Sequence, residues 1–214
     1  FWKNEFEALK KHCDAVGIAF MSTPFDVESA HFLNDMMDVF KISSSDITNK
    51  PFIRTLCDFG KPILLSTGAA HLHEIAEAVE WIEEKGNKLA LLHCVLNYPT
   101  ADENAALGMI PALKRHFPQH AIGYSDHTLP KDMHILETAT LLGPATGAHG
   151  LHGLARFALL TLVLGGGVVP VHGADVVAVG TVFGGELPVA FIDVGARAAQ
   201  HFQAFGGLVD DHVD

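Results

Sequence analysis

The chain is short of positive charge and of paired cysteines. Its 214 residues include 14 Lys and Arg against 25 Asp and Glu, a formal net charge of −11. This balance disfavours nonspecific binding to nucleic acid or to an anionic membrane, because both require a cationic face. The three cysteines show no CxxC spacing, which is typical of reduced thiols in the cytosol. We therefore expect a cytoplasmic protein without a nucleic-acid or membrane partner.

Long unbroken hydrophobic runs and several common enzyme motifs are also missing. The most apolar stretch, residues 157–171, is interrupted by three successive glycines and a proline, which argues against a membrane span. Residues 1–5, which include the charged side chains of Lys3 and Glu5, do not resemble a signal peptide. No Walker loop, GxGxxG fingerprint, HExxH pair or GxSxG elbow occurs. The sequence thus gives no sign of a P-loop, dinucleotide-binding, zincin or α/β-hydrolase enzyme.

The chain does contain a repeated unit, a short apolar run that ends in a cluster of polar, chemically capable side chains. The runs cover residues 16–21, 39–40, 63–65, 89–92 and 121–124. The spacing of apolar residues, with caps and closing glycines, predicts helices over 3–14, 27–38, 46–59, 70–85, 110–116 and 131–142. Strands and helices that alternate in this way are typical of βα units in a parallel sheet.

The polar clusters at the strand ends favour an α/β fold of the (β/α)8 TIM-barrel type. Such barrels fill their interior with branched apolar residues and carry out chemistry at the carboxyl ends of the strands. A closed barrel of this type has eight strands and typically about 250 residues. The runs between residues 16 and 124 supply too few strands. The barrel is therefore incomplete unless further strands lie outside this region.

The composition changes at about residue 143. Residues 144–214 contain no Lys, Ser, Asn, Met, Cys, Tyr or Trp, and Gly, Val, Ala, Leu and His dominate there. Because Ser and Lys are among the commonest residues of globular domains, their joint absence over this length is hard to attribute to chance. Three interpretations compete: a genuine glycine-rich α/β segment, a fused or low-complexity extension, and a frame-shifted or misassembled translation, which we favour slightly. We divide the chain into a partial barrel, residues 1–143, and a tail of uncertain structure, residues 144–214.

Two strand ends carry groups suited to an anion. Lys41 is followed by Ser43 and Asp46, which indicates either an ordinary surface loop or a cationic anchor for a phosphate or carboxylate. If the neighbours of Lys41 in the strand face the helices, the lysine points into the barrel mouth. Ser66 and Thr67 precede a glycine and a helix, whose free N–H groups suit an anion, although an ordinary helix cap would look the same.

The cluster Ser125-Asp126-His127 gives a sharper signal. A histidine at a strand end can be a metal ligand, an acid–base group or a hydrogen-bonded core residue. His93 ends an equivalent run, so two imidazoles could face one cavity. The residue types also allow a Ser-His-Asp triad, although the GxSxG elbow is missing.

These segments together resemble the N-acetylneuraminate (sialic acid) synthase family, which includes legionaminate, pseudaminate and spore-coat polysaccharide synthases. The resemblance covers residues 1–143 and rests on FMSTPFD (20–26), FKISSSDITN (40–49), KPILLSTGAA (61–70), LLHCVLNYPT (91–100) and IGYSDHT (122–128). It implies a (β/α)8 barrel enzyme, a carbon–carbon bond-forming transferase. Such an enzyme condenses phosphoenolpyruvate with an N-acetylated amino sugar of the N-acetylmannosamine type, giving a nine-carbon 2-keto sugar acid and phosphate.

The resemblance also implies roles for individual residues. Lys41 would bind phosphoenolpyruvate and serve catalysis, with Asp46 as a candidate proton carrier or sugar contact. The further substrate-binding residues would be Ser43, Ser66, Thr67, Asn97, Tyr98 and Ser125. A divalent metal ion, Mn or Mg, would bind His127 and His149 and polarise the sugar aldehyde.

The chain departs from the family at both ends. The family's first two strands, which carry an acidic residue and another Lys, would lie before Phe1. Its eighth strand reads Glu-Lys-His-Phe, of which residues 144–150 retain only His149. The family's C-terminal antifreeze-like domain is not recognisable. We therefore expect a barrel that is incomplete at the N-terminus and atypical at the C-terminus.

Two other functions stay open. A different phosphoenolpyruvate-dependent aldol synthase would share the apolar core and differ in its sugar contacts. A truncated barrel could instead be inactive and act only as a binding or association module, since exposed strand edges and apolar surface invite a homodimer or aggregation.

Overall fold

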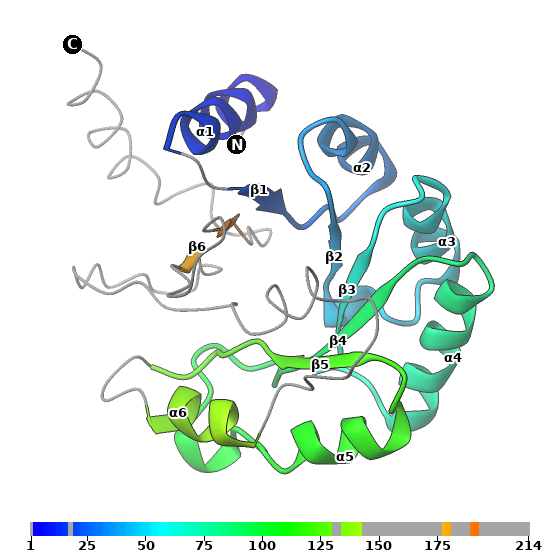
Figure 1. Cartoon of the computed structure of the whole chain (residues 1–214), viewed down its shortest axis with the longest axis vertical. Coiled ribbons are helices and arrows are strands. Elements are labelled where there is room, and N and C mark those ends of the chain that lie inside the picture. Colours follow the sequence, from blue (N-terminus) through cyan, green and yellow to red (C-terminus); the bar gives the residue numbers. More distant parts are fainter. Residues whose placement is uncertain (1, 17–18, 130–133, 143–176, 181–188, 193–214) are drawn as a thin grey trace.

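The computed structural model describes residues 2–16, 19–129, 134–142, 177–180 and 189–192, and Figure 1 shows their arrangement. Most of the tail, including the predicted metal ligand His149, lies outside the described residues.

The centre of the fold is a four-stranded parallel sheet in the order β2-β3-β4-β5. These strands span Phe40–Ile42, Ile63–Ser66, Leu89–His93 and Ala121–Tyr124. The helices α3, α4 and α5 that connect them span Lys50–Asp58, Leu72–Glu83 and Met109–His116. Figure 1 shows α2 to α5 along one side of these strands. The predicted α/β fold with a parallel sheet is confirmed, whereas the described residues do not form a closed eight-stranded barrel.

The remaining elements flank this sheet. They are α1 (Lys3–Val16), β1 (Ala19–Ser22), α2 (Val27–Asn34), α6 (His134–Leu141) and two short 3-10 helices, η1 (Ser44–Asp46) and η2 (Asp102–Asn104). The tail contributes β6 (Val177–Gly180) and β7 (Val189–Ile192). β1 pairs with β7 in parallel, and β7 pairs with β6 in antiparallel orientation. All the predicted runs over residues 16–124 therefore contain a strand, with shifted ends.

Every residue of β2 to β5 is buried, as is typical of the strands of a parallel sheet. Phe40 and Ile42 of β2 belong to the helix face, where Phe40 stacks on Phe59 at the end of α3 with ring centroids 5.2 Å apart. Because side chains alternate along a strand, Lys41 must lie on the other face. We call this second side of the sheet the Lys41 face.

One predicted helix is shorter in the structure than the sequence suggests. The predicted helix over 27–38 begins as expected, because the Asp26 carboxylate accepts a hydrogen bond from the Ser29 amide at 2.7 Å. It ends early, at Asn34, where the ammonium of Lys61 donates to the carbonyl oxygens of Asn34 and Met37. These bonds satisfy carbonyls that a longer helix would have used internally.

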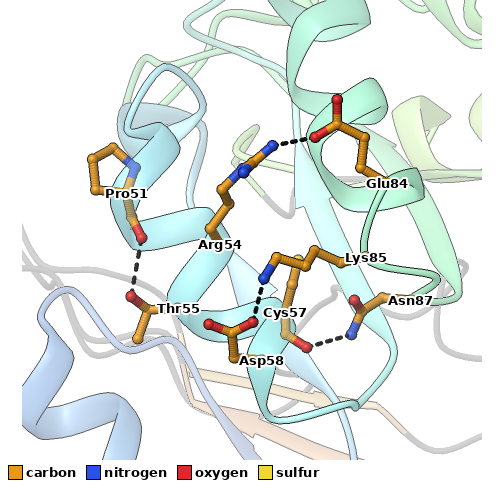
Figure 2. Close-up of polar contacts among 8 residues, drawn as sticks. All are labelled: Pro51, Arg54, Thr55, Cys57, Asp58, Glu84, Lys85 and Asn87. Carbon is orange, nitrogen blue, oxygen red and sulfur yellow. Dashed lines mark hydrogen bonds and ion pairs between the residues drawn. The ribbon is translucent and has the colours of Figure 1, made fainter.

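The helices α3 and α4 are held together by polar contacts that Figure 2 shows in detail. Arg54 pairs with Glu84, and the ammonium of Lys85 lies 2.5 Å from a carboxylate oxygen of Asp58. Both pairs are substantially exposed, so each contributes at most about 1 kcal/mol. Asn87 is more deeply placed, and its amide nitrogen donates to Cys57 O at 3.0 Å and to Lys61 O at 2.8 Å.

We expect Asn87→Ala to lower the free energy of unfolding by about 1–3 kcal/mol, because two partly buried carbonyls lose a donor. Lys85→Ala serves as the control, and should cost less than about 1 kcal/mol because it breaks only an exposed ion pair. Urea unfolding of both variants measures the difference. Equal losses in the two variants would contradict this ranking.

Candidate functional site

Lys41 lies in the middle of β2 and is only 3% exposed. Its register partner in β3 is Leu64, so Ser66, two residues further along, shares the Lys41 face. Ser66 is paired with Leu92 in β4, which places Cys94 on the same face. Because the strands are parallel, these groups all approach one edge of the sheet, where the strands end.

Ser66 ends β3 with a buried hydroxyl that has no hydrogen-bond partner among the described residues. The neighbouring Thr67 is different, since its hydroxyl donates to Leu92 O at 3.2 Å. A buried hydroxyl without a partner costs stability, so its presence points to a ligand or water that completes its hydrogen bonding. Of these two predicted substrate contacts, Ser66 is therefore the one whose hydroxyl can still form a hydrogen bond to a substrate.

The residues after β2 lie in a short 3-10 turn. The predicted contact Ser43 is half-buried at the start of η1, and its hydroxyl oxygen accepts a hydrogen bond from Ser45 at 3.0 Å. The neighbouring Ser44 is buried, and its hydroxyl interacts with the thiol of Cys94. Because the strand ends at Ile42, its two-residue alternation does not continue through Ser43 and Ser44.

Asp46, the predicted proton carrier, ends η1 and is partly buried. Burial raises the pKa of its carboxyl above the ordinary value, against the opposing effect of hydrogen bonds from Asn49 and Ser45. A carboxyl of this kind exchanges a proton nearer to neutral pH than an exposed aspartate does.

Thr23 is a candidate that the sequence analysis does not single out. It follows β1, is buried, and its hydroxyl has no partner among the described residues. The signal in the sequence is the same as for Ser66, a hydroxyl residue directly after an apolar run.

His127 and Ser125 lie at the end of β5. The Nδ1 of His127 is 2.6 Å from Val95 O, and since a carbonyl only accepts, Nδ1 must carry the hydrogen. The other nitrogen, Nε2, lies 3.4 Å from the Ser125 hydroxyl, within hydrogen-bond distance. A histidine held in this way by a backbone carbonyl has the orientation of a metal ligand.

The predicted sugar contacts Asn97 and Tyr98 lie in the exposed loop after β4. The Tyr98 ring stacks on the His127 ring, with centroids 4.2 Å apart and an angle of 29° between the planes. The structure thus brings Tyr98, His127 and Ser125 together at the end of β5, while the Asn97 side chain is exposed.

The possibility of a Ser-His-Asp triad is wrong for this chain. Both carboxylate oxygens of Asp126 accept hydrogen bonds from Thr128, at 2.8 Å from its amide and 3.0 Å from its hydroxyl. The hydroxyl of Tyr124 also donates to Asp126, at 3.1 Å. Asp126 therefore fixes the local turn and does not orient His127.

The expectation that His93 shares a cavity with His127 is also wrong. His93 alternates with Cys94 and faces the opposite side of the sheet, where its Nε2 donates to Ala105 O at 2.9 Å. Its ring stacks on Tyr124 with centroids 5.6 Å apart. Burial lowers the pKa of His93, so the neutral ring is favoured and its role is to hold the loop before α5.

The described residues do not complete a metal centre. Among them, no group of three or more His, Cys, Asp or Glu side chains is placed to hold a metal ion. His127 offers one nitrogen, and the second predicted ligand, His149, lies outside the described residues. A single imidazole does not by itself fit a resident Mn or Mg ion.

A search of the described helices for a membrane-crossing segment finds none with the needed length and apolar character.

Comparison with known proteins identifies a matching family, related proteins and similar solved structures. The profile of the NeuB family matches residues 1–146. The N,N'-diacetyllegionaminic acid synthase of Campylobacter jejuni is 41% identical over 136 residues, which are 62% of this chain and 40% of that protein. The chain thus spans less than half of this relative.

Solved structures agree with this. The N-acetylneuraminic acid synthetase of Leptospira borgpetersenii superposes with a TM-score of 0.64 at 36% identity, covering 67% of this chain and 50% of the other. A truncated 3-deoxy-D-arabino-heptulosonate 7-phosphate synthase of Thermotoga maritima has a TM-score of 0.56 at 17% identity over 66% of this chain and 56% of the other, which shows a shared fold alone. Because the family profile spans well over half of its residues, the chain belongs to the NeuB family.

Proposed function

We propose that the protein to which this chain belongs condenses phosphoenolpyruvate with an N-acetylated amino sugar of the N-acetylmannosamine type. The products would be a nine-carbon 2-keto sugar acid and inorganic phosphate. Membership of the NeuB family and likeness to sialic acid and legionaminic acid synthases support a sugar acid synthase. We also propose that residues 1–143 are part of a (β/α)8 barrel whose other strands lie outside the described parallel sheet.

The observation that carries the proposal is a buried ammonium beside a buried hydroxyl that has no partner in the described chain. Lys41 and Ser66 lie on one face of the sheet at its carboxyl edge. An ammonium in a buried position donates strong, charge-assisted hydrogen bonds to phosphate and carboxylate oxygens, so a site of this kind favours an anion over a neutral ligand. Phosphoenolpyruvate offers both a phosphate and a carboxylate to such donors.

The reaction forms one carbon–carbon bond and breaks one carbon–oxygen bond. C3 of phosphoenolpyruvate bonds to the aldehyde carbon of the open-chain sugar, water adds at C2, and the tetrahedral intermediate loses phosphate. Lys41, Ser66 and Thr67 would hold the anion, with Ser125 at the end of β5 as a further donor. Asp46, whose carboxyl pKa is raised by burial, would carry a proton to the developing sugar alkoxide.

The sugar would bind on the outer side of this anion site. Asn97 and Tyr98 are exposed in the loop after β4, and the Tyr98 ring lies against His127. We propose His127 as one ligand of a divalent ion that would polarise the aldehyde, with its other ligands outside the described residues.

The direct test is calorimetric titration of phosphoenolpyruvate into the 214-residue chain, with lactate and inorganic phosphate as comparison ligands. Phosphoenolpyruvate should bind more tightly than either, because it carries both a carboxylate and a phosphate. Lactate offers only a carboxylate, and inorganic phosphate offers no carboxylate. Phosphate release in the presence of N-acetylmannosamine and Mn then tests the condensation. Failure of phosphoenolpyruvate to bind would contradict the proposed site.

We expect Lys41→Met to weaken phosphoenolpyruvate binding by about 10- to 100-fold, the value of a charge-assisted hydrogen bond. Lys61→Met is the matched control. It removes donors to Asn34 O and Met37 O at the amino end of β3, so it should lower the melting temperature and leave the affinity unchanged. An equal loss of affinity in both variants would contradict the assignment of Lys41.

Ser66→Ala should separate affinity from stability. It removes a buried hydroxyl without a partner, so we expect equal or higher stability together with weaker phosphoenolpyruvate binding. Thr67→Val removes a hydroxyl that is already bonded to Leu92 O, and it should lower stability by about 1 kcal/mol. Thermal unfolding and calorimetry on the same samples measure both quantities. A clear loss of stability in Ser66→Ala would show that the hydroxyl has a structural partner.

A further inference from the structure

Cys94 is the residue at which three strand ends meet. It directly follows β4, is 3% exposed, and lies on the Lys41 face. The amide of Gly68, which follows β3, and the hydroxyl of Ser44, which follows β2, are placed to donate hydrogen bonds to its sulfur, while the Thr67 amide donates to Leu92 O at 3.0 Å. The Lys41 ammonium is close enough to act on the same thiol electrostatically.

The contact between Cys94 and the turn after β3 is tight. A Cβ atom built on Gly68 would lie 2.6 Å from the Cys94 sulfur and 2.9 Å from its carbonyl oxygen, both closer than real Cβ contacts. The φ angle of Gly68 is not in the left-handed region, so close approach is the reason that this position needs glycine. The turn that carries Ser66 and Thr67 is therefore seated directly on the sulfur.

A thiol suits this position better than the alternatives. Desolvation raises the pKa of Cys94 more than Lys41 and the hydrogen bonds lower it, so the sulfur is a neutral thiol. A carboxylate in its place would pair with Lys41 and consume the charge that an anionic substrate needs. A neutral, polarisable acceptor can hold two neighbouring loops without adding a negative charge beside the Lys41 ammonium.

We propose that Cys94 is a positioning residue that fixes the Ser44 turn and the Ser66–Gly68 turn around the Lys41 ammonium, so that the anion site is formed before the ligand arrives. The inference rests on the proposed phosphoenolpyruvate site and extends it to a residue that need not touch the ligand. Without the sulfur, Gly68 N–H and the Ser44 hydroxyl lose a buried acceptor, and both turns gain freedom that binding must then remove.

The test compares two deletions of a buried thiol. Cys94→Ala should weaken phosphoenolpyruvate binding to the 214-residue chain by about tenfold, and Cys94→Ser should recover part of that loss because its hydroxyl can still accept from Gly68. Cys57→Ala is the matched control, since Cys57 is equally buried on α3 but its thiol lies outside this cluster. It should lower stability without changing the affinity.

A second measurement needs no ligand. Hydrogen exchange of the Gly68 amide should accelerate in Cys94→Ala and stay unchanged in Cys57→Ala. If wild type binds phosphoenolpyruvate and Cys94→Ala binds equally well, the positioning role is overturned and the proposed function stands. If wild type does not bind, the proposed function fails. Unchanged Gly68 exchange in Cys94→Ala would then overturn the positioning role independently.

Discussion

The register of four parallel strands is the constraint on which the site depends. β2 must bury Phe40 and Ile42 against the helices, and this requirement alone forces the intervening Lys41 to the other face. A slip of one residue would exchange the two faces and place the ammonium against the stacked ring of Phe59. The register that pairs Lys41 with Leu64 is therefore fixed by the burial of Phe40 and Ile42, and this register positions the Lys41 charge. Burial of its neighbours in the strand is enough to place the Lys41 side chain on this face.

Much of this could be predicted from the sequence, because the responsible signals are local. An apolar run reveals a buried strand, and Asp26 reveals a helix start, without knowledge of distant residues. Polar clusters after successive runs indicate a common edge, since parallel strands place their carboxyl ends together. Lys41 lies in the middle of β2, Ser66 ends β3 and Ser125 follows β5, so all three lie towards the carboxyl edge of one parallel sheet. Their chemical roles stay proposals.

The errors come from features that local patterns do not contain. His93 and Cys94 are adjacent, so which one faces the site depends on the register of β4, and the sequence alone does not supply that register. The 3-10 turn after Ile42 buries Ser44 and leaves Ser43 half-buried, a difference that the strand pattern does not contain. The helix after Asp26 ends where Lys61, a residue remote in sequence, donates to the carbonyls of Asn34 and Met37. Each case is decided by a partner from another part of the chain.

Buried polar side chains occur at both ends of the parallel sheet, and their surroundings differ. At the amino end, the Lys61 ammonium and the Asn87 amide nitrogen donate hydrogen bonds to backbone carbonyls and connect successive loops, although Asn87 Oδ1 has no partner in the described chain. At the carboxyl end, the hydroxyl of Ser66 is its one polar side-chain group, and it is buried without a partner in the described chain. An unsatisfied group of this kind lowers stability. Replacing Asn87 by an apolar residue would lose two hydrogen bonds, whereas a protein whose only task was to fold would lose nothing by an apolar residue at position 66. The retained Ser66 hydroxyl therefore favours a ligand at the carboxyl edge.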